Sequence, residues 1–340
     1  MALKKITKSS LKSAFDVCNH LIKQEDGQCI IKTGFKNIDT NRGGLRRGEI
    51  YVLAGRPAMG KTAFVLNLVK HVAVDEKRPI VYFFGSHNSF TIQANLLKLI
   101  SATEQKTDSL NFEEYEAPVS KIVNAPVYYY EGNDFSEADV LANILEKRIS
   151  PDLIVFDEVN NNLLSGREYQ RIARAMNCPV IITVSVSRDV EERDDHVPLL
   201  CDIKDQALAK QADNVWILYR DAYYDYESIF GNRADLHISK SSYPNTGIEL
   251  FEWHSESMKF IEYEEAGICR GKEKKLIEKG EPLIEEAIEY ACSQEKVSIG
   301  MLQQKFSIGF NRAARMLDLL IEKDIISEVK GSYITNSKQN

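Results

Sequence analysis

One segment, residues 55–62 with the sequence GRPAMGKT, constrains the fold of this chain more than any other. It fits the pattern GxxxxGK[ST] in full, directly follows the apolar run IYVLA and precedes the helical sequence AFVLNLVKHVA. A strand, a glycine-rich loop and a helix in this order form a phosphate-binding loop (P-loop), in which backbone N–H groups and the helix N-terminus surround phosphate oxygens. The segment therefore predicts an α/β fold built around a nucleotide site.

The residue types at this site suggest how ATP and Mg²⁺ would be bound. We expect Lys61 to reach the β- and γ-phosphates and the hydroxyl of Thr62 to bind Mg²⁺. Asp157 ends the apolar run LIVFD and would hold the magnesium shell, while Glu158 beside it is placed to activate the attacking water. The other interpretation is that Glu158 only caps the following helix or loop. The residues expected to bind the nucleotide are Gly55, Arg56, Gly60, Lys61, Thr62 and Ala63.

Short apolar runs alternate with helical patterns between residue 50 and about residue 263. The runs are IYVLAG, IVYFFG, VYYY, DLIVFD, PVIITVSV, NVWILY, DLHISK, IELFEW and KFIEY. Apolar runs rich in β-branched and aromatic residues that alternate with helices indicate a mostly parallel sheet covered by helices. The last three runs follow one another without a helix between them, which predicts an antiparallel edge.

The two ends of the chain have different patterns from the middle. A helix is predicted from about Ser9 to Lys23. After a charged stretch, three helical stripes and a short β-like tail in about 60 residues predict a winged helix-turn-helix. The expected organisation is a linker helix (1–30), a P-loop domain (31–264), a charged linker (265–281) and a winged-helix domain (282–340).

Composition excludes several classes of protein. Among the 340 residues, 43 are basic and 50 acidic, and the formal net charge of -7 argues against a generally basic nucleic-acid coat. No apolar run approaches the roughly 18–20 residues of a membrane span, and the N-terminus lacks the apolar stretch of a signal peptide. We therefore expect a cytoplasmic protein without a membrane partner. The six cysteines form no CxxC pair, which favours buried thiols over disulfides or zinc.

Several collinear segments resemble the ATPase domain of DnaB-type replicative helicases, over about residues 30–263. They are TGFKNIDTNRGGLRRGEIYVLAGRPAMGKTAFVLNL, APVYYYEGNDFS, the strand ending at Asp157, SRDVEERDDHVPLLCDIKD, QADNVWILYRDAYYD and ISKSSYPNTG. The resemblance implies a RecA-like fold and a homo-hexamer that moves along single-stranded DNA using ATP. It also implies that Lys240 reaches the γ-phosphate bound by the neighbouring subunit, and that the helix before Thr33 docks on that subunit.

Three departures from the family pattern affect the expected chemistry. His87 stands where the family has a catalytic glutamate, Ser242 where it has an arginine finger, and Ser185 where it has a glutamine. The stretch 157–179, where a DNA-binding loop is expected, is shorter than in the family. Because an arginine finger contributes about 10³ or more in rate in related systems, either Glu158 has become the base or hydrolysis is slow or absent.

The C-terminal segment resembles the gamma domain of FtsK-type DNA translocases, a winged helix that recognises short sequences on duplex DNA. The most specific part, IGFNRAARMLD, covers the recognition helix, where Arg312 and Arg315 lie three residues apart and hence on one face. The residues expected to contact DNA are Gln304, Lys305, Asn311, Arg312 and Arg315. The other interpretation is a protein-interaction domain.

The leading hypothesis is an ATP-dependent DNA helicase or translocase in DNA replication or processing. Single-stranded DNA would pass through its ring, and duplex DNA would bind the winged helix. The alternative is a DNA-binding regulator that binds ATP with little or no hydrolysis, and a third possibility is a P-loop protein with a non-DNA substrate. DNA-stimulated ATP turnover that Lys61→Ala abolishes would distinguish the motor.

Overall fold

The structure is a computed structural model, and it describes residues 30–335 with internal gaps. The residues left out within that range are 86–87, 105–115, 133, 160–162, 194–195, 225–230, 244–245, 264–282, 295, 307–312, 314–315, 318, 322, 324 and 330–331. The helix expected near the N-terminus and the charged linker thus lie outside the described residues. Two compact units form: residues 1–187 with 198–262, and residues 188–197 with 263–340.

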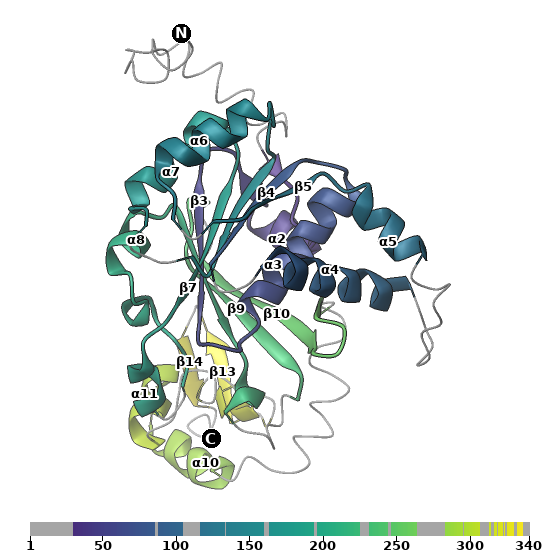
Figure 1. The fold of residues 1–340 in the computed structure, drawn as a ribbon. Helices are drawn as coiled ribbons and strands as arrows, with labels where there is room; N and C mark the ends of the chain where they lie inside the picture. Colours follow the sequence, from purple (N-terminus) through teal and green to yellow (C-terminus); the bar gives the residue numbers. More distant parts are fainter. Residues whose placement is uncertain are drawn as a thin grey trace. The chain divides into compact units, whose positions relative to one another are not determined.

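The first unit is organised around a large sheet. Within the described residues this sheet has nine strands in the order β11-β10-β9-β8-β3-β7-β6-β4-β5 (Figure 1). The strands are β3 (Ile50–Gly55), β4 (Ile80–Phe84), β5 (Val127–Tyr130), β6 (Leu153–Asp157), β7 (Val180–Ser185), β8 (Asn214–Tyr219), β9 (Arg233–Lys240), β10 (Gly247–His254) and β11 (Lys259–Glu262). Strands β8 to β5 run parallel, whereas β9, β10 and β11 are antiparallel to their neighbours. The predicted mostly parallel sheet with an antiparallel edge is confirmed.

Helices cover both faces of this sheet. They are α3 (Lys61–Val69), α4 (Ser89–Glu104), α5 (Glu116–Val123), α6 (Glu137–Glu146), α7 (Gly166–Met176) and α8 (Gln206–Gln211). Figure 1 shows α3, α4 and α5 on one side and α6, α7 and α8 on the other. Because both faces are covered, β3, β6 and β8 are buried along their whole length, as expected for central parallel strands.

Several short elements were not expected from the sequence pattern. A two-stranded antiparallel sheet, β1 (Ile30–Ile31) with β2 (Leu45–Arg46), flanks α2 (Lys36–Asn41). A π-helical segment, η2 (Lys70–Asp75), continues α3, and the 3₁₀ helices are η4 (Arg188–Glu192), η5 (Leu200–Asp202) and η6 (Asp221–Tyr223). These elements are too short to leave a hydrophobic period in the sequence.

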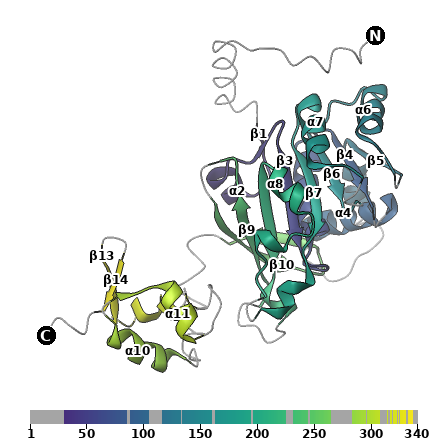
Figure 2. The same cartoon turned by 90° about the vertical axis from the view of Figure 1, so that its left-hand side faces the viewer.

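The second unit contains the helices and hairpin expected near the C-terminus (Figure 2). Its described elements are α10 (Ile284–Ser293), β12 (Lys296–Val297), α11 (Ile299–Phe306), β13 (Ile326–Val329) and β14 (Ser332–Thr335). The strand order is β12-β14-β13, and Ala287, Ala291, Leu302, Met316 and Leu320 are buried at its core. The described residues of the third predicted helix, 313, 316–317 and 319–321, are helical. The arrangement is that of a winged helix.

Among the described residues, no helix combines the length and the apolar character needed to span a membrane.

Candidate nucleotide-binding site

The P-loop connects the end of β3 to the start of α3, and two of its glycines are required by close packing. Gly60 has a φ of +100°, and a Cβ there would lie 3.2 Å from Cζ of Phe260. A Cβ on Gly55 would lie 3.0 Å from the carbonyl oxygen of Leu218. Only glycine allows both the left-handed turn and this close approach, so the loop can wrap around a small anion.

Lys61 is the first residue of α3, and its side chain is 3% exposed. Its Nζ lies 3.6 Å from Oε1 of Glu158 and donates a long 3.4 Å hydrogen bond to the carbonyl of Arg56. Burial lowers the pKa of Lys61, and the carboxylates of Glu158 and Asp157 oppose this shift. Since both contacts are long, the ammonium group can exchange them for phosphate oxygens at low cost.

Asp157 ends β6 and is fully buried. The hydroxyl of Tyr82 donates to its Oδ2 at 2.8 Å, and that of Thr183 donates to its Oδ1 at 2.7 Å. Burial raises the pKa of Asp157, while hydrogen bonds from Thr183, Tyr82 and Thr62 lower it. The structure thus brings together Thr62 and Asp157, the two residues expected to hold magnesium.

Glu158 has an unusual backbone for a residue with a side chain, with a φ of +51°. Its N–H donates to Oγ1 of Thr183 at 2.7 Å, and its carbonyl lies so close to Gly85 that a Cβ there would be 2.1 Å away. The side chain is 32% exposed and faces Lys61. The first described helix after Glu158 is α7, and its N-terminus is capped by Ser165 and Glu168. Glu158 is therefore not the cap of that helix.

Three residues at this site were missed in the sequence: Thr183, which contacts Asp157 and Glu158, and the pair Arg220 and Trp253. The guanidinium of Arg220 donates to the carbonyl of Ala58 at 2.7 Å and lies 5.4 Å from the centre of the Trp253 ring. Its Nε is buried without a hydrogen-bond partner, and burial lowers its pKa. The Trp253 ring also lies 3.9 Å from the Cβ position of Gly60. The position of Arg220 directly after β8 was the available signal, since neighbouring parallel strands end at the same edge as the P-loop.

The structure places Lys240 and Ser242 far from the P-loop of the same chain. Lys240 ends β9 and pairs with Val215 near the start of β8, so it lies at the opposite edge of the sheet. Its Nζ donates to the carbonyl of Lys210 at 2.8 Å, and the Ser242 hydroxyl donates to Oε2 of Glu49 at 2.7 Å. Within one chain, therefore, neither residue lies at the P-loop.

The remaining predicted residues are distributed as follows. Arg56 is buried and donates to the carbonyl of Val186 at 3.2 Å, and Ala63 is buried in the first turn of α3. Ser185 ends β7 and pairs with Gly55, at the P-loop edge. His87 lies outside the described residues.

In the winged helix, Gln304 and Lys305 are exposed in the last turn of α11. The ammonium group of Lys305 lies 5.7 Å from the Tyr290 ring. The three recognition-helix residues, Asn311, Arg312 and Arg315, lie outside the described residues.

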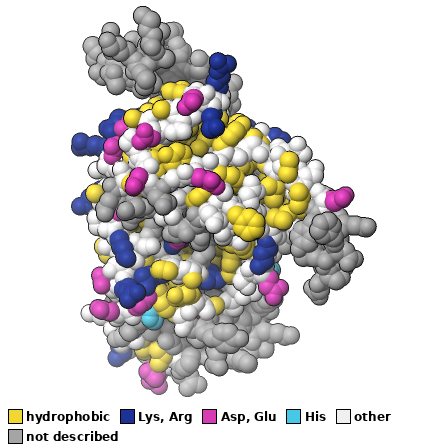
Figure 3. All heavy atoms as spheres, viewed as in Figure 1, with side chains coloured by type: hydrophobic (Ala, Val, Ile, Leu, Met, Phe, Trp, Pro, Cys, Tyr) yellow, Lys and Arg dark blue, Asp and Glu magenta, His cyan; other side chains and the backbone are white. Residues whose placement is uncertain are grey.

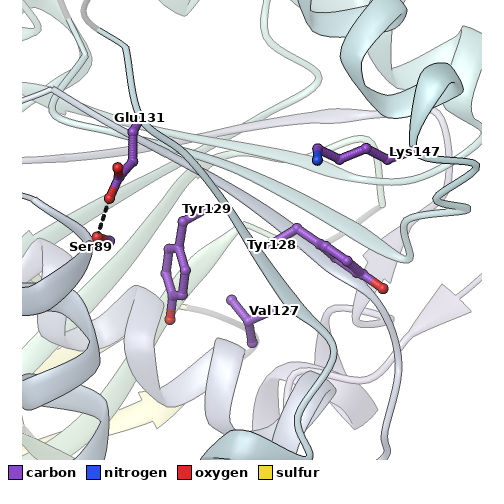
Figure 4. Close-up of a pocket in the computed structure, with 6 residues that line it drawn as sticks. All are labelled: Ser89, Val127, Tyr128, Tyr129, Glu131 and Lys147. Carbon is purple, nitrogen blue, oxygen red and sulfur yellow. Dashed lines mark hydrogen bonds between the residues drawn. The ribbon is translucent and has the colours of Figure 1, made fainter.

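A pocket of about 700 Å³ lies away from this site, at the sheet edge formed by β5. Its lining residues are Ser89, Val127, Tyr128, Tyr129, Glu131 and Lys147 (Figure 4). Hydrophobic side chains also gather over α4 and α5 (Figure 3), where Phe90 is 80% and Val123 76% exposed. Neither feature includes a residue of the P-loop.

The residues present at the P-loop fit a nucleoside triphosphate with its magnesium ion. The left-handed Gly60, the weakly held ammonium group of Lys61 and the buried carboxylate beside Thr62 provide a cradle, a cation and metal ligands. Among the described residues, no group of three or more His, Cys, Asp or Glu side chains could hold a metal ion.

A P-loop between β3 and α3, with a carboxylate at the end of β6 in a mostly parallel sheet, defines a RecA-like P-loop nucleotide-binding protein. The chain belongs to the family described as DnaB-like helicase C terminal domain, which it matches over residues 30–262. Residues 278–333 match a second family, the FtsK gamma domain. Both resemblances noted in the sequence are thereby confirmed.

Curated relatives support the same assignment. A replicative DNA helicase of Bacillus subtilis, DnaC, is 27% identical over 291 residues, covering 78% of this chain and 64% of the relative. The DnaB of Geobacillus stearothermophilus is 27% identical over 268 residues, covering 72% and 59%. This chain therefore spans about three fifths of the length of these relatives.

Solved structures share the fold. One of them, an isolated ATPase domain, has a TM-score of 0.65 at 23% identity, covering 76% of this chain and all of that domain. A DnaB-like replicative helicase studied for its interactions with primase has a TM-score of 0.63 at 24% identity, covering 76% of this chain and 68% of that one.

Proposed function

We propose that this chain is an ATP-dependent motor on DNA, a helicase or translocase of the DnaB type that acts in DNA replication. The observation that carries the proposal is the distance of 3.6 Å between Lys61 and Glu158 beside a complete P-loop. It combines a phosphate-binding cation with an available carboxylate in a family whose curated relatives are named replicative DNA helicases. A protein that only binds ATP needs no such carboxylate.

The P-loop residues bind the nucleotide in this proposal. Gly55 and Gly60 give the loop its shape, and Lys61 exchanges its contact with Glu158 for the β- and γ-phosphates. Thr62 and Asp157 hold Mg²⁺, which neutralises charge that develops on the phosphates. Arg220, stacked on Trp253 beside Gly60, provides a flat cationic surface for the adenine base, because guanidinium groups and indole rings both stack on aromatic bases.

Glu158 takes the proton of the attacking water. Its backbone is left-handed and its N–H is bound by Thr183, and its carboxylate lies 3.6 Å from the ammonium group of Lys61. Thr183 also binds Asp157, so the base and the metal ligand are positioned by one hydroxyl group. This role replaces that of the family glutamate, at whose position this chain has His87.

The proposed assembly follows from the positions of Lys240 and the P-loop at opposite ends of the sheet. Lys240 lies at the edge opposite the P-loop, so a head-to-tail arrangement is required to bring it to a nucleotide. A closed head-to-tail arrangement is a ring, and we take it to be the hexamer implied by the family. Single-stranded DNA passes through this ring.

The winged helix binds duplex DNA in this proposal and orients the ring on it. Support comes from the match to the FtsK gamma domain and from the exposed Gln304 and Lys305 in α11. Asn311, Arg312 and Arg315 are assigned to base edges and phosphates of the major groove, because arginine and asparagine can each make two hydrogen bonds to a base.

A second candidate function is an ATP-dependent regulator that hydrolyses little or no ATP. The observation in its favour is Ser242, which offers a neutral hydroxyl bound to Glu49 where the family has a guanidinium. In such a protein ATP stabilises assembly on DNA, and the motor cycle has been lost.

Steady-state ATP hydrolysis distinguishes the two functions. We expect turnover by the purified full chain to rise with DNA, and to fall to background in Lys61→Ala. Parallel reactions without DNA, with single-stranded DNA and with duplex DNA identify the activating strand form. Turnover at the Lys61→Ala level, with ATP still bound by the wild type, would contradict the motor and support the regulator.

A further inference from the structure

Three arginines precede the P-loop strand, and one of them forms no ion pair with another described residue. Arg42 forms an ion pair with Glu249 at 2.7 Å, and Arg47 forms one with Asp152. Arg46, between them in β2, has no ion pair within the described part of the chain. Its Nε is also buried without a hydrogen-bond partner. A guanidinium that forms no ion pair with a described residue keeps its charge available for an anion supplied from outside the chain.

The guanidinium of Arg46 is held in place without an anion. It lies 4.9 Å from the centre of the Tyr243 ring, in a cation–π contact. Gly43, with a φ of +74°, lies beside both groups. A Cβ there would be 3.5 Å from the Tyr243 ring and 3.7 Å from Nη2 of Arg46. A planar cation fixed against a ring is ready to bind phosphate oxygens with two hydrogen bonds.

The location of Arg46 connects it to the neighbouring subunit. Tyr243 directly follows Ser242 and lies three residues after Lys240, beyond the end of β9. Arg46 itself lies four residues before the start of β3, whereas the P-loop follows the end of the same strand. Arg46 thus lies near the start of β3, at the end of the sheet opposite the P-loop of its own chain.

We propose that Arg46 is the guanidinium that each subunit presents to the nucleotide phosphates bound by the P-loop of the next copy. It supplies in trans the positive charge that Ser242 cannot provide. The inference rests on the proposed motor function and its head-to-tail assembly. Phosphoryl transfer concentrates negative charge on the phosphate oxygens, and an arginine from a second chain stabilises that charge.

Steady-state kinetics of the full chain test this role. We expect Arg46→Ala to lower kcat for ATP at least about 10²-fold, with little change in the Kd of a fluorescent ATP analogue. Arg46→Lys keeps the positive charge but loses the planar guanidinium that can make two hydrogen bonds to a phosphate, so it should retain only part of the wild-type kcat. The matched control Arg47→Ala removes the adjacent guanidinium, which is bound within the chain, and should keep the wild-type kcat. Thermal unfolding of Arg46→Ala should differ little from that of the wild type, because the substitution removes the cation–π contact with Tyr243 but no ion pair with a described residue.

Mixed rings test whether the charge acts in trans. Arg46→Ala and Lys61→Ala chains, each inactive alone, are co-expressed in equal amounts with different tags and purified through both tags. An interface is intact where the P-loop comes from the Arg46→Ala chain and the arginine from the Lys61→Ala chain. Random assembly makes about one quarter of interfaces intact, so about that share of the wild-type rate should return.

The outcomes separate the two proposals. A wild type without DNA-stimulated turnover overturns the motor function and with it the role of Arg46. A turning-over wild type with an equally active Arg46→Ala variant overturns only the role of Arg46. Mixed rings that remain inactive contradict action in trans.

Discussion

Charged residues have different surroundings at the two ends of the parallel strands, the end that carries the P-loop and the opposite end. At the P-loop edge, Lys61 is buried with only long contacts, the pKa of Asp157 is raised by burial, and Arg220 has an unsatisfied Nε. At the opposite edge, Arg42 pairs with Glu249 and Arg47 with Asp152. Among the described residues, the two arginines at the opposite end form close ion pairs, whereas Lys61 and Arg220 at the P-loop end keep only long or incomplete contacts.

Arg46 is the exception that this comparison exposes. It lies at the end where Arg42 and Arg47 are paired, yet it shares two features with Arg220: a cation–π contact with an aromatic ring and a buried Nε without a hydrogen-bond partner among the described residues. In the assembly proposed above, these two arginines would lie on the two sides of one nucleotide site shared between neighbouring copies.

Removing the carboxylate at the P-loop edge should produce the largest effect. Glu158→Gln keeps the shape but cannot accept the proton of water, so we expect turnover to fall about 10²–10⁴-fold while ATP binding persists. Stopped-flow binding of a fluorescent ATP analogue and steady-state turnover measure the two quantities. Wild-type turnover in this variant would exclude Glu158 as the base.

At the opposite edge, breaking a pair should affect stability rather than rate. Arg42→Gln leaves the carboxylate of Glu249 buried and unpaired, which costs about 3–5 kcal/mol in the free energy of unfolding. Urea denaturation measures the loss, and turnover per folded molecule should match the wild type. A selective loss of turnover would mean that the two edges do not divide their roles as proposed.

Thr183→Val should affect both properties, since Thr183 connects Asp157 to the backbone of Glu158. The substitution leaves the Glu158 N–H and one oxygen of Asp157 without their partner, and we expect a loss of about 1–3 kcal/mol in stability. Turnover should also decrease. Thr183→Ser keeps the hydroxyl group and serves as the control, and equal defects in both variants would point to the lost methyl group instead.

The smallest expected effect is a pH dependence. Because the pKa of Asp157 is raised in the folded state, its contribution to stability is greatest below its unfolded pKa of about 3.9 and is lost as pH rises through the folded pKa. The wild type should therefore gain stability relative to Asp157→Asn as pH falls from 7 towards 4. Urea midpoints of both proteins across this range measure it, and a constant difference would contradict the raised pKa.

Local sequence patterns predicted the parts of the site that lie close together in the chain. The P-loop follows its strand directly, and Asp157 ends a run of apolar residues, so both were placed by pattern and spacing. Thr183, Arg220 and Trp253 could not be assigned in this way. Their roles depend on contacts between strands that are distant in sequence, and their types are common in strands for reasons of packing alone.

The same limit applies to the fold. The nine apolar runs predicted the strands of the large sheet within the described residues, because each run is long enough to show its composition. Strands β1 and β2 have two residues each, and the π-helical segment η2 continues α3 without a change of composition. Such elements are specified by tertiary contacts rather than by hydrophobic period.

The packing of α3 determines what moves with the nucleotide. Phe64 in this helix contacts Phe251 and Phe260, with ring centres 5.6 and 5.2 Å away. Asn67 donates to the carbonyl of Met258 at 2.9 Å and accepts from the N–H of Phe260 at 3.3 Å. Ring packing and two hydrogen bonds thus join α3 to the β10–β11 hairpin. If the proposed motor function holds, a shift of the P-loop on phosphate release would reach the antiparallel strands through these contacts of α3.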